Sequence, residues 1–185
     1  MSNLGTTAII LAGGKGSRMY YQDKAWVRYA GKPLIEHVIT HIQQDVDHIL
    51  ISRAASQSEE KKLDYHLIRD EKQDFQGPLA GIASCVPHIE TDNALVLPCD
   101  TPILPKTLVS CLVRNLADFD VAVASSEGII QPLIFAAKSR VLYSIQPYLE
   151  SGERSAKGWL SSVPFIDIDF GSEKFENINE PSQLR

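Results

Sequence analysis

The sequence contains few cysteines, no excess of basic residues and no long hydrophobic segment, and each absence narrows the class of protein. Its three cysteines, Cys85, Cys99 and Cys111, are odd in number and lack C-x-x-C spacing, which is typical of reduced, mostly buried thiols in a cytosolic protein. The net charge of −5 argues against a broad nucleic-acid-binding surface. No apolar run approaches membrane-spanning length, and the first residues lack the regions of a secretory signal. We therefore expect a cytoplasmic protein that binds neither nucleic acid nor membrane.

No repeat, low-complexity tract or obvious linker divides the chain. Its 185 residues are 44% hydrophobic, which is enough to form one sizeable core. We therefore expect a single domain that covers residues 1–185.

Short apolar segments alternate with amphipathic ones along the chain. Strands are predicted at residues 7–11, 48–52, 65–68, 94–97, 121–124, 133–137 and 163–168. Helices are predicted at residues 34–42, 79–86, 106–116 and 139–149, the last kinked or ended by Pro147. This alternation predicts an α/β fold with a largely parallel sheet covered on both faces.

A glycine-rich segment follows the first predicted strand. Gly13, Gly14 and Gly16 surround Lys15, and Arg18 comes two residues later. Glycine allows backbone N–H groups to approach an anion closely, and the cations add charge, so a nucleotide or phosphorylated ligand is indicated. The segment fits neither the G-x-x-x-x-G-K-[ST] phosphate loop nor the G-x-G-x-x-G dinucleotide motif. Taken alone, it is equally compatible with a glycine-rich turn that carries two solvated cations.

Two aspartates follow other predicted strands, so they should lie at the same sheet edge as the glycine segment. Asp100 follows the strand at 94–97, and a carboxylate there suits Mg²⁺ together with substrate phosphates. Its alternative is a capping or solvated aspartate. Asp70 is equally compatible with a nucleotide contact and a turn cap. Lys24 is placed to reach phosphates held by the glycine segment, although an exposed lysine is the usual case.

Two further pairs of polar residues have informative spacing. Asn177 and Asn179 would face the same side of an extended segment. For Asn177 we favour a role in the site. Asn179 is equally suited to a site role and to capping a helix that begins near Pro181. His37 and His41 have the i, i+4 spacing of a metal site but lack the glutamate of the zinc motif. We therefore expect them to flank the apolar stripe of a helix without binding zinc. No Ser/His/Asp or Cys/His nucleophile arrangement emerges.

Taken in order, these segments resemble the MobA-type family of molybdenum cofactor guanylyltransferases. The resemblance runs from residue 8 to residue 184, and each motif is modest while the ordered series is specific. It rests on L-A-G-G-K-G-S-R-M at 11–19, D-K at 23–24, G-K-P-L at 31–34, Asp70, Q-G-P-L-A-G at 76–81, P-C-D-T-P at 98–102, Q-P-L at 131–133, G-E-R at 152–154 and N-I-N at 177–179.

The resemblance implies a fold, a reaction and a set of site residues. The fold is a three-layer α/β/α, Rossmann-like nucleotidyltransferase fold of the glycosyltransferase-A type. The reaction transfers GMP from GTP to molybdopterin or its molybdenum-bearing form and releases pyrophosphate, with Mg²⁺ as cofactor. Cofactor-insertion proteins and target molybdoenzymes are further implied partners. The implied nucleotide-binding residues are Leu11, Ala12, Gly13, Gly14, Lys24, Ser52, Asp70 and Asp100. The catalytic residues are Lys24, Asp100 and Arg18, the metal ligand is Asp100, and the pterin side holds Arg154, Asn177 and Asn179.

Three residues, Ser52, Tyr20 and Tyr21, depart from the family pattern, and the Gly13–Gly14 pair bears on which nucleotide base is bound. Ser52 stands where the family commonly has a nucleotide-contacting asparagine. Tyr20 and Tyr21 stand where it commonly has a glycine, which puts the path of the phosphate loop in doubt. Relatives that use CTP tend to have L-A-A-G in place of L-A-G-G, so the Gly13–Gly14 pair favours GTP.

Several functions stay open beside GMP transfer. CTP or a sugar-phosphate acceptor would give a related nucleotidyltransferase. A non-catalytic nucleotide-binding module is the alternative from another class; the two tyrosines favour it, and the presence of Lys24, Asp70 and Asp100 opposes it.

Overall fold

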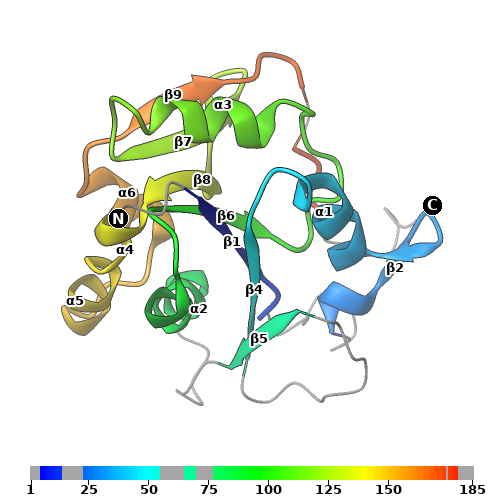
Figure 1. The fold of residues 1–185 in the computed structure, drawn as a ribbon, viewed down its shortest axis with the longest axis horizontal. Helices are drawn as coiled ribbons and strands as arrows, with labels where there is room; N and C mark the ends of the chain where they lie inside the picture. Colours follow the sequence, from blue (N-terminus) through cyan, green and yellow to red (C-terminus); the bar gives the residue numbers. More distant parts are fainter. Residues whose placement is uncertain (1–4, 14–22, 55–64, 70–76, 174, 179–185) are drawn as a thin grey trace.

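The computed structural model describes residues 5–13, 23–54, 65–69, 77–173 and 175–178. In this part of the chain, the central feature is a sheet of seven strands in the order β5-β4-β1-β6-β8-β7-β9 (Figure 1). The strands are β1 (Thr6–Leu11), β4 (His48–Arg53), β5 (His66–Arg69), β6 (Asn93–Pro98), β7 (Val121–Ser126), β8 (Ile129–Lys138) and β9 (Ile166–Asp169). A small second sheet pairs β2 (Arg28–Tyr29) with β3 (Lys32–Pro33).

The main sheet is mostly parallel, as predicted. Strands β5, β4, β1 and β6 run parallel, and β7 runs parallel to β9. Strand β8 alone is antiparallel to its described neighbours β6 and β7. The reason is a tight turn at Glu127 and Gly128, which both have positive φ, so β7 returns directly as β8 in a hairpin.

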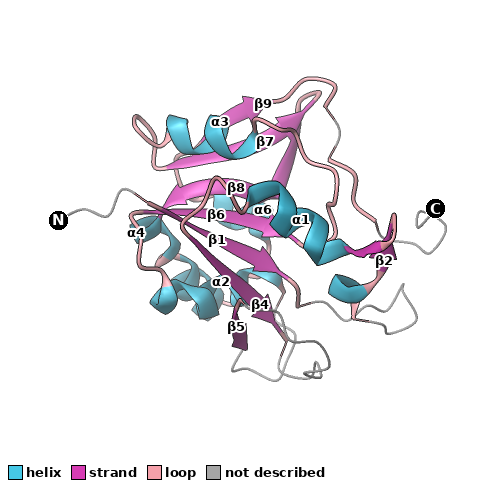
Figure 2. Ribbon diagram, turned by 45° about the vertical axis from the view of Figure 1, so that its right-hand side comes forward, coloured by secondary structure: helices cyan, strands magenta, loops and turns pink. Residues whose placement is uncertain are grey.

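Helices cover both faces of the sheet and complete three layers (Figure 2). The helices are α1 (Leu34–Ile42), α2 (Pro78–Cys85), α3 (Leu108–Asn115), α4 (Ser139–Leu142), α5 (Ile145–Glu150) and α6 (Ala156–Ser161). Successive strand residues point to opposite faces, so Ile10 packs in the core under α1 and α3, whereas Ile9 packs under α2, α5 and α6. Each such fully buried side chain stabilises the fold by about 1.5–3 kcal/mol. No helix within the described residues is long and apolar enough to cross a membrane.

Three local features differ from the sequence expectations. The helix predicted at 139–149, expected to be kinked or ended by Pro147, is interrupted earlier, at Tyr143 and Ser144, and forms two helices. Pro147 explains the position, because a proline ring clashes with the carbonyl four residues earlier, which is that of Tyr143. The β2–β3 hairpin and α6 were not expected. The hairpin turns through Ala30 and Gly31, both with positive φ.

Candidate active site

The carboxyl ends of three parallel strands form a rim that brings separate motifs together. Leu11 at the end of β1 is in register with Ser52 of β4 and with Pro98 of β6. Beyond the strands, the Ala12 N–H donates to the Ser52 carbonyl at 2.9 Å, and the Cys99 N–H donates to the Leu11 carbonyl at 3.1 Å. Gly13, the first residue of the glycine segment, and Asp100 therefore share one edge, as the strand order predicted. Three predicted site residues of this edge, Gly14, Arg18 and Asp70, lie outside the described residues.

Backbones approach closely where the first strand leaves the sheet. A Cβ atom at Gly13 would lie 3.0 Å from the Ala54 backbone nitrogen and 3.4 Å from the Arg53 carbonyl carbon. Glycine therefore allows the loop after β1 to pass against the loop after β4. Ser52 is buried, and its hydroxyl packs against Gly81 of α2, where a Cβ atom would overlap it.

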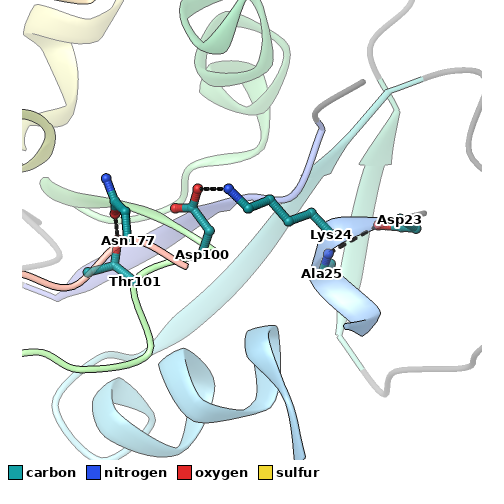
Figure 3. A network of polar contacts seen from close by, with 6 residues as sticks. All are labelled: Asp23, Lys24, Ala25, Asp100, Thr101 and Asn177. Carbon is teal, nitrogen blue, oxygen red and sulfur yellow. Dashed lines mark hydrogen bonds and ion pairs between the residues drawn. The ribbon is translucent and has the colours of Figure 1, made fainter. Parts of the chain in front are cut away.

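An ion pair stands at the centre of this rim. The Lys24 Nζ donates to Asp100 Oδ2 at 2.5 Å, and the two side chains are only 17% and 19% exposed. Lys24 opens the short 3₁₀ helix η2 (Lys24–Trp26), and Asp100 lies two residues beyond β6 (Figure 3). Charged groups attract more strongly where water is partly excluded, so this pair is held in a defined place.

A second ion pair involves Asp23, the residue before Lys24. Arg53, at the end of β4, donates to Asp23 Oδ2, and Asp23 Oδ1 accepts from the Ala25 N–H at 3.3 Å, which caps η2. Burial raises the pKa of the Asp23 carboxyl, although the Arg53 guanidinium and the Ala25 N–H act in the opposite direction.

A segment from near the end of the chain joins the rim. The Ile178 N–H donates to the Asp100 carbonyl at 2.8 Å, and the Thr101 hydroxyl donates to the Asn177 amide oxygen. Ile178 is buried with Val27 and Leu34, which fixes the segment against the start of α1. The structure thus brings Asn177 beside Asp100 and Lys24, three residues that the sequence analysis selected separately (Figure 3). Asn179 lies outside the described residues.

Comparison with known proteins identifies the family of the chain. The family model of the MobA-like NTP transferase domain matches residues 8–164. The chain belongs to this family. A molybdenum cofactor guanylyltransferase of Shewanella piezotolerans is 35% identical over 180 residues, which are 95% of this chain and 88% of that protein. Another of the same name, from a Shewanella species, is 37% identical over 95% of this chain and 91% of its own length.

Solved structures share the MobA-like fold at much lower identity. Molybdopterin-guanine dinucleotide biosynthesis protein A from Archaeoglobus fulgidus superposes with a TM-score of 0.75 at 20% identity, covering 96% of this chain and 94% of that one. A 2-C-methyl-D-erythritol 4-phosphate cytidylyltransferase from Thermus thermophilus gives a TM-score of 0.73 at 14% identity, covering 95% and 94%. These likenesses confirm the predicted nucleotidyltransferase fold.

Other residues selected from the sequence make hydrogen bonds to partners outside the ion-paired group. The Arg154 guanidinium donates to the carbonyls of Leu149 at 2.7 Å and Glu153 at 2.6 Å, so it joins the end of α5 to the segment before α6. Its place on the pterin side stays a prediction. His37 Nε2 lies 2.7 Å from the Tyr29 carbonyl, and His41 Nε2 lies 3.0 Å from that of Pro105. These two imidazoles therefore link α1 to its neighbours.

The described part of the rim offers one hard oxygen ligand. Asp100 supplies one carboxylate, and no group of three His, Cys, Asp or Glu side chains gathers within the described residues. The Asp100 carboxylate is the type of ligand that Mg²⁺ binds, together with water and substrate phosphates. Burial, together with the neighbouring Asp100 carboxylate, raises the pKa of the Cys99 thiol far above its usual range. Cys99 is a buried core residue, which is typical of a structural thiol.

Sequence reasoning missed two residues of this group, Arg53 and Thr101. Arg53 directly follows an apolar strand at the predicted rim, which is a detectable signal. Its burial and its pairing with Asp23, thirty positions earlier, depend on the fold. Thr101 follows Asp100, but nothing in the sequence joins it to Asn177.

Proposed function

We propose that this chain transfers GMP from GTP to the phosphate of molybdopterin, or of its molybdenum-bearing form, and releases pyrophosphate. The observation that carries the proposal is the Lys24–Asp100 pair at the rim where β1 and β6 end. The relatives of this family are named as molybdenum cofactor guanylyltransferases, and this supports the choice of nucleotide and acceptor.

The reaction requires no general base. A phosphate monoester has a second pKa of about 6, so the acceptor is mostly dianionic at neutral pH. One of its oxygens forms a bond to the α-phosphorus of GTP. The bond from that phosphorus to the bridging β-phosphate oxygen breaks, and its electron pair leaves with pyrophosphate. No proton has to be removed from the attacking group.

The difficulty is electrostatic, because two polyanions must approach and charge develops on the leaving group. The Lys24 ammonium extends from η2 and would neutralise phosphate charge. Asp100 is the residue that would hold Mg²⁺, which supplies charge neutralisation and orientation of phosphates when bound. Such reactions depend mainly on positioning and electrostatics, and partly buried, rigidly held charges meet that need.

The choice of GTP rests on the Gly13–Gly14 pair. Relatives that use CTP tend to have alanine in this segment, and a Cβ atom at Gly13 would press on the Ala54 backbone. We therefore propose that the close passage of the two loops at Gly13 shapes a pocket suited to guanine.

One assay separates the candidate functions. The protein is supplied with Mg²⁺, molybdopterin and either GTP or CTP, and both nucleotide incorporation and pyrophosphate release are measured. Incorporation from GTP and loss of activity with EDTA are expected. Preference for CTP would overturn the guanine assignment. Nucleotide binding without pyrophosphate release would favour a binding module, and release only with a sugar phosphate would identify another acceptor.

A further inference from the structure

Arg53 is a buried cation beside the candidate active site that the proposed reaction does not use. Its side chain is 6% exposed and forms an ion pair with Asp23, whose side chain is 23% exposed. A buried arginine is uncommon unless it is paired. With so little exposed surface, the guanidinium is poorly placed to meet a substrate directly.

Asp23 connects Arg53 to Lys24 through the backbone. One carboxylate oxygen pairs with Arg53, and the other accepts from the Ala25 N–H and so caps η2. This helix has only three residues, Lys24–Trp26, and so short a helix has little stability of its own. The cap therefore fixes the point from which the Lys24 side chain extends toward Asp100 (Figure 3).

Two ion pairs, Arg53–Asp23 and Lys24–Asp100, are joined through the backbone between the neighbouring residues Asp23 and Lys24. The two pairs begin at the end of β4 and finish beyond β6, the two strands on either side of β1. Burial raises the pKa of the Asp23 carboxyl despite the facing Arg53. Removing the Arg53–Asp23 pair from water costs free energy, so its presence is weak evidence that it stabilises the fold. This favours a role in positioning the residues of the site.

We propose that Arg53 is a positioning residue that acts through Asp23 to hold the Lys24 ammonium where the phosphates of the nucleotide must lie. The proposal rests on the proposed function only for the identity of those phosphates. The arrangement of the two pairs is independent of which nucleotide binds.

A double-mutant cycle tests this proposal with Arg53→Met, Asp23→Asn and the combined variant. A small misplacement of a catalytic group can cost about a hundredfold in rate, so each single variant should lower kcat for GMP transfer by about ten- to a hundredfold. The KM for molybdopterin should not change. Because both residues act through one contact, the combined variant should lose no more than the worse single variant. Arg53→Lys should recover part of the rate.

Arg140→Met is the matched control, since it removes an exposed arginine that pairs with Asp120 at 2.6 Å away from the rim. Its kcat should equal that of the wild type. Thermal unfolding of every variant gives the folded fraction, to which kcat is normalised. A normalised kcat for Arg53→Met equal to that of the wild type, or fully additive losses in the cycle, would overturn the proposal.

A second measurement does not depend on turnover. The substrate-free protein is treated with an amine-acylating reagent, and the rate at Lys24 is followed by peptide mass spectrometry. Arg53→Met should speed acylation of Lys24 several-fold relative to wild type and Arg140→Met, because the ammonium is held less firmly. An unchanged rate would contradict the positioning role. If the wild type transfers no nucleotide at all, the proposed function fails, whereas this measurement still decides the role of Arg53.

Discussion

Asp100 combines two properties that distinguish it from the other aspartates of the described rim. Its carboxylate pairs with Lys24 at 2.5 Å, and its main-chain carbonyl receives the Ile178 N–H. Asp100→Asn keeps the shape of the side chain but removes its charge. We expect this variant to lose about a hundredfold or more in Mg²⁺-dependent turnover, the range seen when a charge-stabilising group is removed. Asp120→Asn, at a remote ion pair, is the control for steady-state assays. Near-normal turnover by Asp100→Asn would contradict the metal assignment.

Gly13 is the residue at which the choice of base can be tested. An alanine Cβ would lie 3.0 Å from the Ala54 nitrogen, so one of the two loops must shift by a few tenths of an ångström. We expect Gly13→Ala to lower kcat/KM for GTP and to reduce the preference for GTP over CTP in a competition assay. Thermal unfolding should change little, because a loop at the sheet edge can relax. An unchanged GTP preference would show that the base is chosen elsewhere.

Elements that bury their side chains could be predicted from the sequence, and elements that are short could not. The continuous apolar runs of β1, β4 and β6 and the regular stripe of α1 identify them without the structure. The β2–β3 hairpin has two residues in each strand, which are too few to show the alternation of apolar and polar residues that identifies a strand. The sequence of α6, AKGWLS, contains a glycine and no clear stripe. The rim followed from strand order, whereas the Arg53–Asp23 contact depends on η2.

The segment 176–178 acts as one element with the loop after β6. Glu176 bridges to Ile103, Ile178 binds the Asp100 carbonyl, and Asn177 accepts from the buried Thr101 hydroxyl. Thr101→Val removes that hydroxyl while keeping the volume, so Asn177 loses its fixed orientation. If Asn177 faces the pterin, KM for molybdopterin should rise several-fold and KM for GTP should stay unchanged. Thr101→Ser keeps the hydroxyl and should behave as wild type in the same steady-state measurements. Equal kinetics for the two variants would exclude this coupling.

At the scale of the whole molecule, the sheet separates two cores that serve different purposes. The layer with α1 and α3 contains Ala25 of η2, so it adjoins the ion-paired group. The layer with α2, α5 and α6 contains Trp159 and Phe135. Both layers contribute apolar burial, and Ala25, the neighbour of Lys24, packs in the first. Stability and catalysis should therefore respond differently to changes in the second core.

Trp159 allows this separation to be tested. The residue is 1% exposed, and its ring packs on Phe135 with the ring centroids 5.6 Å apart. Its indole N–H donates to the Ser144 hydroxyl at 3.0 Å. Trp159→Ala should reduce the free energy of unfolding by about 3–5 kcal/mol, and Trp159→Phe by less, as measured by urea denaturation. At temperatures where the variants remain folded, kcat and both KM values should match the wild type. A fall in kcat parallel to the loss of stability would mean that the second core also positions the rim.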